Sequence, residues 1–234
     1  TWSPDEVRSA LMMTAVTTIT KEDGSSSADP FDMGSGRVDL SQAVRAGLVL
    51  DETKANYDAA NPALSGDPQT LNLPSLANSN CLSSCDWTRT FHSTLTASTQ
   101  WTASVQAPPG MVVTVTPNVF TVPAFANQTL PFTANVAQAD GTQGWIFATV
   151  TLSSPGQADL HLPIAVQKAY GSDLAALSKT APAFAQPGQI ITYTITLDNL
   201  DAISHTFSLT DTLPAGLAYV PTSAAGGLAY NSAS

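Results

Sequence analysis

Apolar and polar residues alternate with a period of two through the centre of the chain. The alternation is cleanest in four series, at residues 101–105, 130–136, 146–152 and 160–166. A period of two indicates strands with one face buried and the other in solvent. Several such strands at this spacing predict an all-β sandwich.

Turn residues separate these strands. Pro108-Pro109-Gly110, Asp140-Gly141 and Ser154-Pro155-Gly156 are typical of tight turns. Pro131 and Pro163 fall inside two of the strand patterns. Because proline cannot donate a ladder hydrogen bond, we expect those two strands to be sheet edges or to be bulged.

The first fifteen residues have a helical pattern instead. Ser3 and Glu6 fit a capping box, and Pro4 stands at the first helical position. One face of this helix is apolar and needs a partner. That face consists of Val7, Ala10 and Leu11. No other segment of the chain is clearly built to cover it, so we expect its partner to lie outside this chain.

A second short helix is predicted after Asp39. Asp39 can cap it, with Gln42 in the capping-box position. We expect Ala43 and Val44 to face inward, and Gly47 to end the helix in the left-handed conformation.

The remaining segments are connectors and a further β region. Residues 16–30 are predicted to form a loop and residues 52–69 an irregular connector. After a boundary near residues 170–173, alternation returns at residues 191–197. Two features of this last region follow in sequence. They are a turn at residues 198–201 and a strand marked by Phe207 and Leu209.

Composition narrows the class of protein. The 234 residues carry 8 Lys+Arg against 18 Asp+Glu, a net charge of −10, and only 11% are charged. This balance argues against nucleic acid and anionic membrane surfaces as partners. Apolar runs stay short of the ~20 residues that span a membrane. The profile suits a secreted β-rich protein.

Two cysteines, Cys81 and Cys85, are separated by three residues. In a secreted chain this spacing favours a small disulfide loop. A metal site is disfavoured because no second Cys or His pair completes four ligands, and a redox motif would need a different spacing and a helix start.

Three stretches resemble subtilisin-like serine proteases (subtilases). Residues 1–15 resemble the helix that follows the catalytic serine segment. Residues 31–39 resemble the Gly-x-Gly-x-Val-Asp/Asn stretch that closes the catalytic domain. Residues 47–51 resemble the Pro-Gly-Leu-Val-Tyr-Asp signature of plant-type members, with Ala46 and Leu50 in place of its proline and tyrosine.

The resemblance has a consequence for catalysis. In that family the nucleophile lies in a Gly-Thr-Ser-Met-Ala motif just upstream of the helix, and this chain begins downstream of it. The resemblance therefore implies a chain without the catalytic Ser, His and Asp. It also implies that the helix packs against a catalytic core that is missing here.

The β region resembles the fibronectin type III-like domain of plant-type subtilases. Four stretches carry this resemblance, at residues 71–76, 88–91, 101–111 and 162–166. Trp101 replaces the usual tyrosine, and the Cys81/Cys85 segment is an insertion.

From residue 172 the chain resembles a bacterial and archaeal surface repeat, the domain of unknown function eleven. Pro187-Gly188 before Tyr193, and residues 211–216, match its motifs, whereas Leu200 and Asp201 stand where an Asn-x-Gly would be completed. This implies a truncated second sandwich and a prokaryotic source.

No residue stands out as catalytic. The three histidines, His92, His161 and His205, are each interpreted as surface residues. Ser35 lies between glycines but within the domain-closing stretch, which disfavours a nucleophile role. No metal site or cofactor is predicted. A Ca²⁺ site at Asp198, Asp201 or Asp211 is the weaker alternative to turn chemistry.

Two other features have ordinary explanations. Asn127-Gln128-Thr129 is a glycosylation sequon, which matters only in a eukaryotic secretory pathway. The four tryptophans could form a sugar platform, but lone tryptophans in strands are more often core, and Trp101 and Trp145 fit that interpretation.

These observations predict a mainly β chain in four parts. Residues 1–51 are a remnant of an α/β subtilase catalytic domain, with short helices, and residues 52–69 are a connector. Residues 70–169 form a fibronectin/immunoglobulin-like sandwich, and residues 172–234 form a truncated surface-repeat sandwich.

The predicted function is that of accessory domains in the C-terminal region of a secreted endopeptidase. These domains would support, position or anchor an upstream catalytic domain, which is the expected intramolecular partner. A protein substrate or a cell-surface partner is also possible, and the expected location is extracellular or at the cell surface. The alternatives are an independent adhesion module or a passive stalk.

Overall fold

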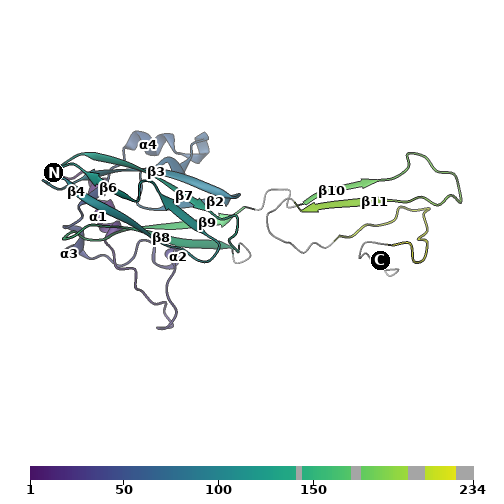
Figure 1. Ribbon diagram of the computed structural model, residues 1–234, viewed down its shortest axis with the longest axis horizontal. Coiled ribbons are helices and arrows are strands. Elements are labelled where there is room, and N and C mark those ends of the chain that lie inside the picture. The colour runs from purple at the N-terminus through teal and green to yellow at the C-terminus, as the bar shows by residue number, and fades with distance from the viewer. Residues whose placement is uncertain (141–143, 170–174, 200–208, 225–234) are drawn as a thin grey trace. The chain divides into compact units, whose positions relative to one another are not determined.

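The computed structural model describes residues 1–140, 144–169, 175–199 and 209–224. Most of the strands lie in two sheets (Figure 1), with orders β1-β3-β7-β5 and β2-β9-β8-β4-β6. The first sheet contains β1 (Leu48–Leu50), β3 (Ser84–Ser93), β7 (Asn127–Asn135) and β5 (Val112–Val115). The second contains β2 (Leu76–Cys81), β9 (Leu160–Lys168), β8 (Trp145–Ser153), β4 (Thr99–Gln106) and β6 (Val119–Val122).

The two sheets enclose the core that the alternation predicts. Side chains along β7 and β8 alternate between buried and more exposed positions. The largest fully buried side chains of the sandwich include Trp101, Phe91, Phe132, Leu130 and Leu152. The mainly β, sandwich-type fold is therefore confirmed.

The two strand prolines do not mark edges, because β7 and β9 are both central in their sheets. Each proline lies where one neighbouring strand has ended. β5 pairs with β7 only from Phe132 onward, and β2 pairs with β9 only from Ile164 onward. Pro131 and Pro163 thus sit one residue outside these ladders, where the missing N–H costs no strand pairing.

The cysteines join the two sheets. Cys81 ends β2 and Cys85 lies in β3, and the structure links them by a disulfide with Cα atoms 5.6 Å apart. Both side chains are buried.

Helix α1 (Pro4–Met13) begins with the predicted capping box of Ser3 and Glu6. Its buried side chains are Glu6, Ser9, Ala10 and Met13. Ala10 and Met13 belong to the same hydrophobic cluster as the sandwich core. The expectation that this helix has no partner within the chain is therefore wrong, and Val7 of the predicted face is 43% exposed.

Two short helices follow, α2 (Pro30–Met33) and α3 (Leu40–Ala43). Asp39 caps α3 as predicted, but Val44 is exposed rather than inward. Gly47 does not adopt the left-handed conformation. A Cβ at this position would lie 2.8 Å from Cζ2 of Trp101, so close packing of the indole explains the glycine.

The predicted irregular connector contains three short helical turns. They are α4 (Lys54–Ala59) and the 3₁₀ turns η1 (Pro62–Leu64) and η2 (Pro68–Thr70). Thr53, Asn61 and Asp67 cap them with side-chain oxygens. Helical segments of three to six residues are too short to show an apolar period.

Beyond residue 169, β10 (Ala175–Thr180) and β11 (Thr194–Asn199) form an antiparallel pair. β11 begins three residues later than the alternation from Ile191 predicts. The predicted turn at 198–201 extends beyond the described residues, and Phe207 lies outside them. Residues 209–224 contain turns but no helix or strand.

Candidate functional site

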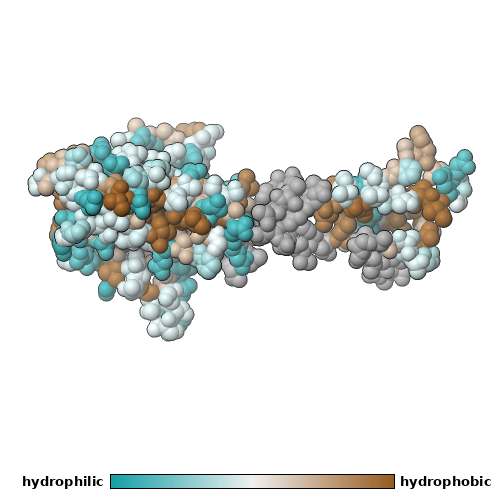
Figure 2. All heavy atoms as spheres, viewed as in Figure 1, coloured by the Kyte–Doolittle hydropathy of each residue, from teal (hydrophilic) through white to brown (hydrophobic). Residues whose placement is uncertain are grey.

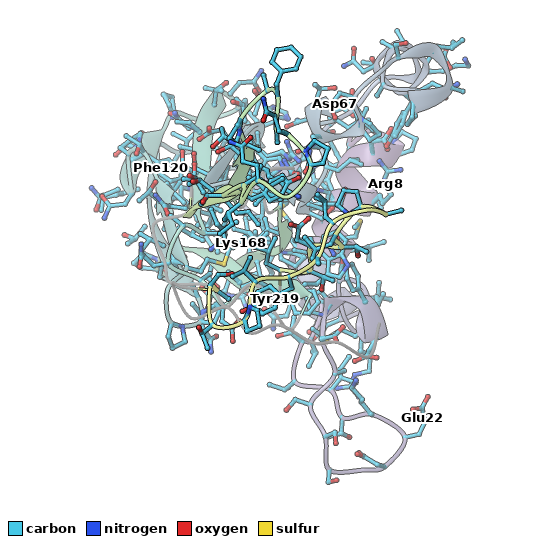
Figure 3. All side chains as sticks on the ribbon, turned by 90° about the vertical axis from the view of Figure 1, so that its right-hand side faces the viewer. Arg8, Glu22, Asp67, Phe120, Lys168 and Tyr219 are labelled. Atoms are coloured by element: carbon cyan, nitrogen blue, oxygen red, sulfur yellow. A yellow bond between two sulfur atoms is a disulfide. The ribbon has the colours of Figure 1, made fainter. Side chains whose placement is uncertain are left out.

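The joint between residues 1–51 and the sandwich combines a strand pairing, polar bonds and an aromatic contact. Figure 3 shows this N-terminal segment as a layer beside the strands, with Arg8 on it and Glu22 at the tip of a projecting loop. Its strand β1 is an edge strand of the first sheet, with Leu48 opposite Ser93 and Leu50 opposite Phe91.

Helix α1 is fixed to the sandwich through two buried polar side chains. Glu6 accepts a hydrogen bond from the Ser3 N–H at 2.8 Å, and its other oxygen lies 2.6 Å from Nδ1 of His92. The Ser9 hydroxyl donates to the Glu6 carbonyl and accepts the Leu50 N–H, both at 2.8 Å. The helix therefore contacts β1 and β3 together.

His161 holds a second point of the N-terminal segment. Its Nε2 lies 2.9 Å from the Ser35 carbonyl oxygen, so Nε2 carries the proton and donates. Burial lowers the pKa of His161, and the bond to Ser35 opposes this in part. His92 and His161 are both partly buried and hydrogen-bonded, whereas the sequence predicted surface histidines. His205 lies outside the described residues.

An aromatic contact covers the second sheet. The Phe31 ring of α2 stands edge-on to Trp145 at 5.0 Å and to Phe147 at 5.2 Å between centroids. Trp145 is only partly buried, so the prediction that it lies in the core is wrong. Trp101 is 0% exposed, which confirms the same prediction for that residue.

The connector is attached by Arg89, which is 2% exposed. Its guanidinium donates to the carbonyls of Leu73 at 2.7 Å, Thr88 at 2.8 Å and Ser75 at 2.9 Å, and to that of Gln69 at 3.3 Å. Burial lowers the pKa of Arg89 to about 10, while Glu52 acts in the opposite direction. The side chain remains charged at neutral pH.

Asn72 completes this attachment, because its side-chain amide bonds both backbone groups of Thr90, as a neighbouring strand would. Its side-chain amide accepts the Thr90 N–H and donates to the Thr90 carbonyl, both at 2.8 Å, and also donates to Asp51 O at 3.1 Å. The Asn72 N–H donates to the Glu52 carboxylate at 2.6 Å.

The sequence contained the signal for this attachment. Residues 71–76 and 88–91 are two of the stretches that carry the fibronectin resemblance. In the structure, Asn72 of the first stretch binds the backbone of Thr90 in the second stretch. Arg89 of the second stretch binds the backbone of Leu73 in the first. Nothing in either stretch alone indicates that the two lie against each other.

The two described histidines bond groups other than a serine hydroxyl. In the described residues His92 bonds a carboxylate and His161 a backbone carbonyl, and neither bonds a serine hydroxyl. No group of three His, Cys, Asp or Glu side chains there is placed to hold a metal ion. No helix of the described part is long and apolar enough to cross a membrane.

Comparison with known families identifies the central region. The model of a fibronectin type-III domain matches residues 70–166. The structures similar to this chain include the PapD-like domain of human CEP192, 11% identical over 42% of this chain and 83% of that one. The TM-score of this match is 0.34.

Curated relatives are proteases. "Subtilisin-like protease SBT3.13" of Arabidopsis thaliana is 28% identical over 194 residues, which is 71% of this chain and 25% of that protein. SBT1.6 of the same plant is 29% identical over 202 residues, covering 70% and 26%. SBT3 of Solanum lycopersicum is 42% identical over 62 residues, covering 24% and 8%.

The chain spans about a quarter of the length of the first two relatives. These relatives are plant proteins, so they lend no support to the predicted prokaryotic source. The surface repeat predicted from residue 172 stays a prediction. The chain contains a fibronectin type III domain at residues 70–166 and is similar to subtilisin-like proteases over about 70% of its length.

Proposed function

We propose that this chain is a non-catalytic accessory region that holds the last elements of a secreted endopeptidase's catalytic domain in place. In this proposal, peptide hydrolysis is performed by a serine in the catalytic domain, and the fibronectin domain stabilises that domain. In this proposal, residues 1–51 belong to the catalytic domain and are also packed on the fibronectin domain.

One observation carries the proposal. The segment that resembles the end of a catalytic domain is built into the sandwich, through β1 in the first sheet and the Glu6–His92 pair. A domain attached by a flexible linker would not share an edge strand with its neighbour. Movement of the sandwich must therefore move this segment.

The outer side of the same segment supports a second contact. Val38, Leu40 and Val44 are 57%, 68% and 76% exposed. Exposed apolar side chains that gather on one part of a surface can mark a contact with another protein or domain. We assign this surface to the catalytic domain, in place of the Val7 face that the sequence suggested.

The test compares the full-length protease with a variant lacking residues 70–169. We expect the deletion to lower secreted yield and thermal half-life, and residues 1–234 alone to hydrolyse no peptide. A deletion variant as stable and active as the parent protein would refute the supporting role. Peptide turnover by the purified chain would refute its non-catalytic nature.

Residues 172–234 are proposed to be a spacer or surface-attachment module. Deleting them should change localisation and leave hydrolysis unaltered. Independent adhesion is the alternative. It gains some support from Figure 2, where small hydrophobic groups interrupt the polar surface of the sandwich. Binding of polysaccharides or cell-surface proteins by the chain would favour that alternative.

A further inference from the structure

Strand β3 is paired unequally on its two sides. β7 pairs with it along its length, from Ser84 to His92. On the other side β1 reaches only Phe91 to Ser93. Within the described residues no strand pairs with that second side between Ser84 and Thr90. This stretch is an open strand edge inside a folded domain.

The register shows which backbone groups face the open side. Pro131 lies opposite Thr88, and its carbonyl accepts the Thr116 N–H on the β5 side at 3.3 Å. The pair Pro131–Thr88 is therefore not hydrogen-bonded, and the backbone of Thr88 points away from β7. Asp86 and Thr90 lie two residues before and after Thr88, so their backbone N–H and C=O groups also point away from β7.

Part of this edge is already occupied. Asn72 takes both backbone groups of Thr90, and Arg89 takes the Thr88 carbonyl. The Thr88 N–H, the Asp86 N–H and the Asp86 carbonyl have no assigned partner in the described part of the chain. Two donors and one acceptor, spaced as in a strand, match the backbone of a short extended peptide.

A pocket of about 350 Å³ lies at this edge. It is formed between η2 and β3, on the connector that carries Asp67 (Figure 3). Its volume is at the lower end of the range for ligand pockets, roughly 300–1,000 Å³. The lining residues are Asp67, Gln69, Thr70, Asp86, Trp87 and Thr88.

The charges at the pocket suit a basic ligand. Asp67 and Asp86 line it, and no basic residue does. Asp67 Oδ1 accepts the Gln69 N–H, and Asp86 Oδ1 accepts the Thr133 hydroxyl, so the second oxygen of each can face a ligand. The guanidinium of Arg89 is bound to four carbonyls, including those of the lining residues Gln69 and Thr88, and Arg89 is 2% exposed.

We propose that the open edge at Asp86–Thr88 and the adjoining pocket bind a short extended polypeptide segment that carries a lysine or arginine. The segment adds as a strand beside β3, and its basic side chain lies between the two carboxylates. Strand addition supplies affinity through the backbone, and the carboxylates supply selectivity. This site is independent of the proposed protease role.

The test measures binding of fluorescent hexapeptides to the whole chain by anisotropy. The first peptide is rich in valine and threonine with a central lysine. The second replaces that lysine by glutamate, and the third carries N-methyl groups on alternate amides. We expect the first to bind and both others to bind at least about tenfold more weakly.

Two variants locate the site. The double variant Asp67→Asn with Asp86→Asn keeps the cap and the Thr133 bond, and should weaken the lysine peptide about tenfold. Its matched control, Asp58→Asn with Glu22→Gln, changes the same net charge elsewhere and should leave binding unchanged. Thr88→Pro removes the open N–H without touching the β7 ladder and should also cost about tenfold.

Several results would overturn the proposal. They are no binding at millimolar peptide, equal binding of the N-methylated peptide, or equal loss in the control variant. Binding of free lysine as tightly as the peptide would show simple cation capture. Preference for a neutral polysaccharide would assign the pocket to another ligand. If Thr88→Pro misfolds, the double aspartate variant still decides.

Discussion

The N-terminal segment (residues 1–51) and the connector (residues 52–69), together with residues 70–75 that follow it, are attached to the same sandwich by different chemistry. The connector depends on one buried guanidinium and one amide, Arg89 and Asn72, which bind backbone groups. The N-terminal segment depends on several separate contacts, two of which use histidine rings. One attachment is concentrated in two side chains, whereas the other is distributed over several contacts and includes His161, whose pKa is lowered by burial.

Arg89→Ala should give the largest effect. It leaves four part-buried carbonyls without this donor, and we expect a loss of about 3–5 kcal/mol in the free energy of unfolding. Urea unfolding of the whole chain measures it. Arg45→Ala is the control, because Arg45 donates one exposed bond to the Gly156 carbonyl at 3.1 Å. A loss below ~1 kcal/mol for Arg89→Ala would show that the attachment is not concentrated.

Asn72→Ala should cost about 2 kcal/mol, because Thr90 loses a partner for both of its backbone groups. Asn72→Asp keeps the acceptor for the Thr90 N–H but loses both donated bonds, so it should not restore stability. Thermal unfolding compares the two variants. Full stability of Asn72→Asp would mean that the donated bonds contribute little.

Ser9→Ala should open the N-terminal segment locally, with a cost of about 1 kcal/mol. The Leu50 N–H loses its acceptor, so its hydrogen exchange should accelerate several-fold more than that of the Leu130 amide in the sandwich. Ser41→Ala, which removes an exposed hydroxyl bonded to Asp39, is the control. Equal acceleration at both amides would show that segment and sandwich open only together.

The smallest effect concerns pH. Burial lowers the pKa of His161 in the folded chain below its ordinary value of 6.5. The unfolded chain therefore binds the proton more readily, and this part of the stability is present above pH 6.5 and lost as the pH falls. His161→Gln, whose amide can still donate to Ser35, should show a flatter stability profile between pH 7 and 5. An unchanged slope would exclude His161 as its source.

Period-two alternation predicted the strands around Phe132 and Val150 because burial along a strand is a local property of the sequence. The capping box of Ser3 and Glu6 was equally local. The joint was not predictable in this way. His92 meets a carboxylate 86 positions away, and His161 meets a carbonyl 126 positions away. A lone histidine carries no local signal of such a partner.

Gly47 is a second residue whose role depends on a contact far away in the sequence. Next to a short helix it was interpreted as a helix end, a role that depends on local backbone conformation. Its actual constraint is the indole of Trp101, more than fifty positions later. The candidate site was missed because its members are identified only by what lies opposite them in the fold.

Strand β1 has a consequence for how such proteins evolve. The recognisable module covers residues 70–166, yet its first sheet is completed by residues 48–50. A gene rearrangement that moved only residues 70–166 would leave the backbone of Phe91 and its neighbours unpaired, and this edge could then pair with another chain. Recombination would therefore be tolerated mainly when the preceding fifty residues travel along, so that protease tail and sandwich are inherited as one unit.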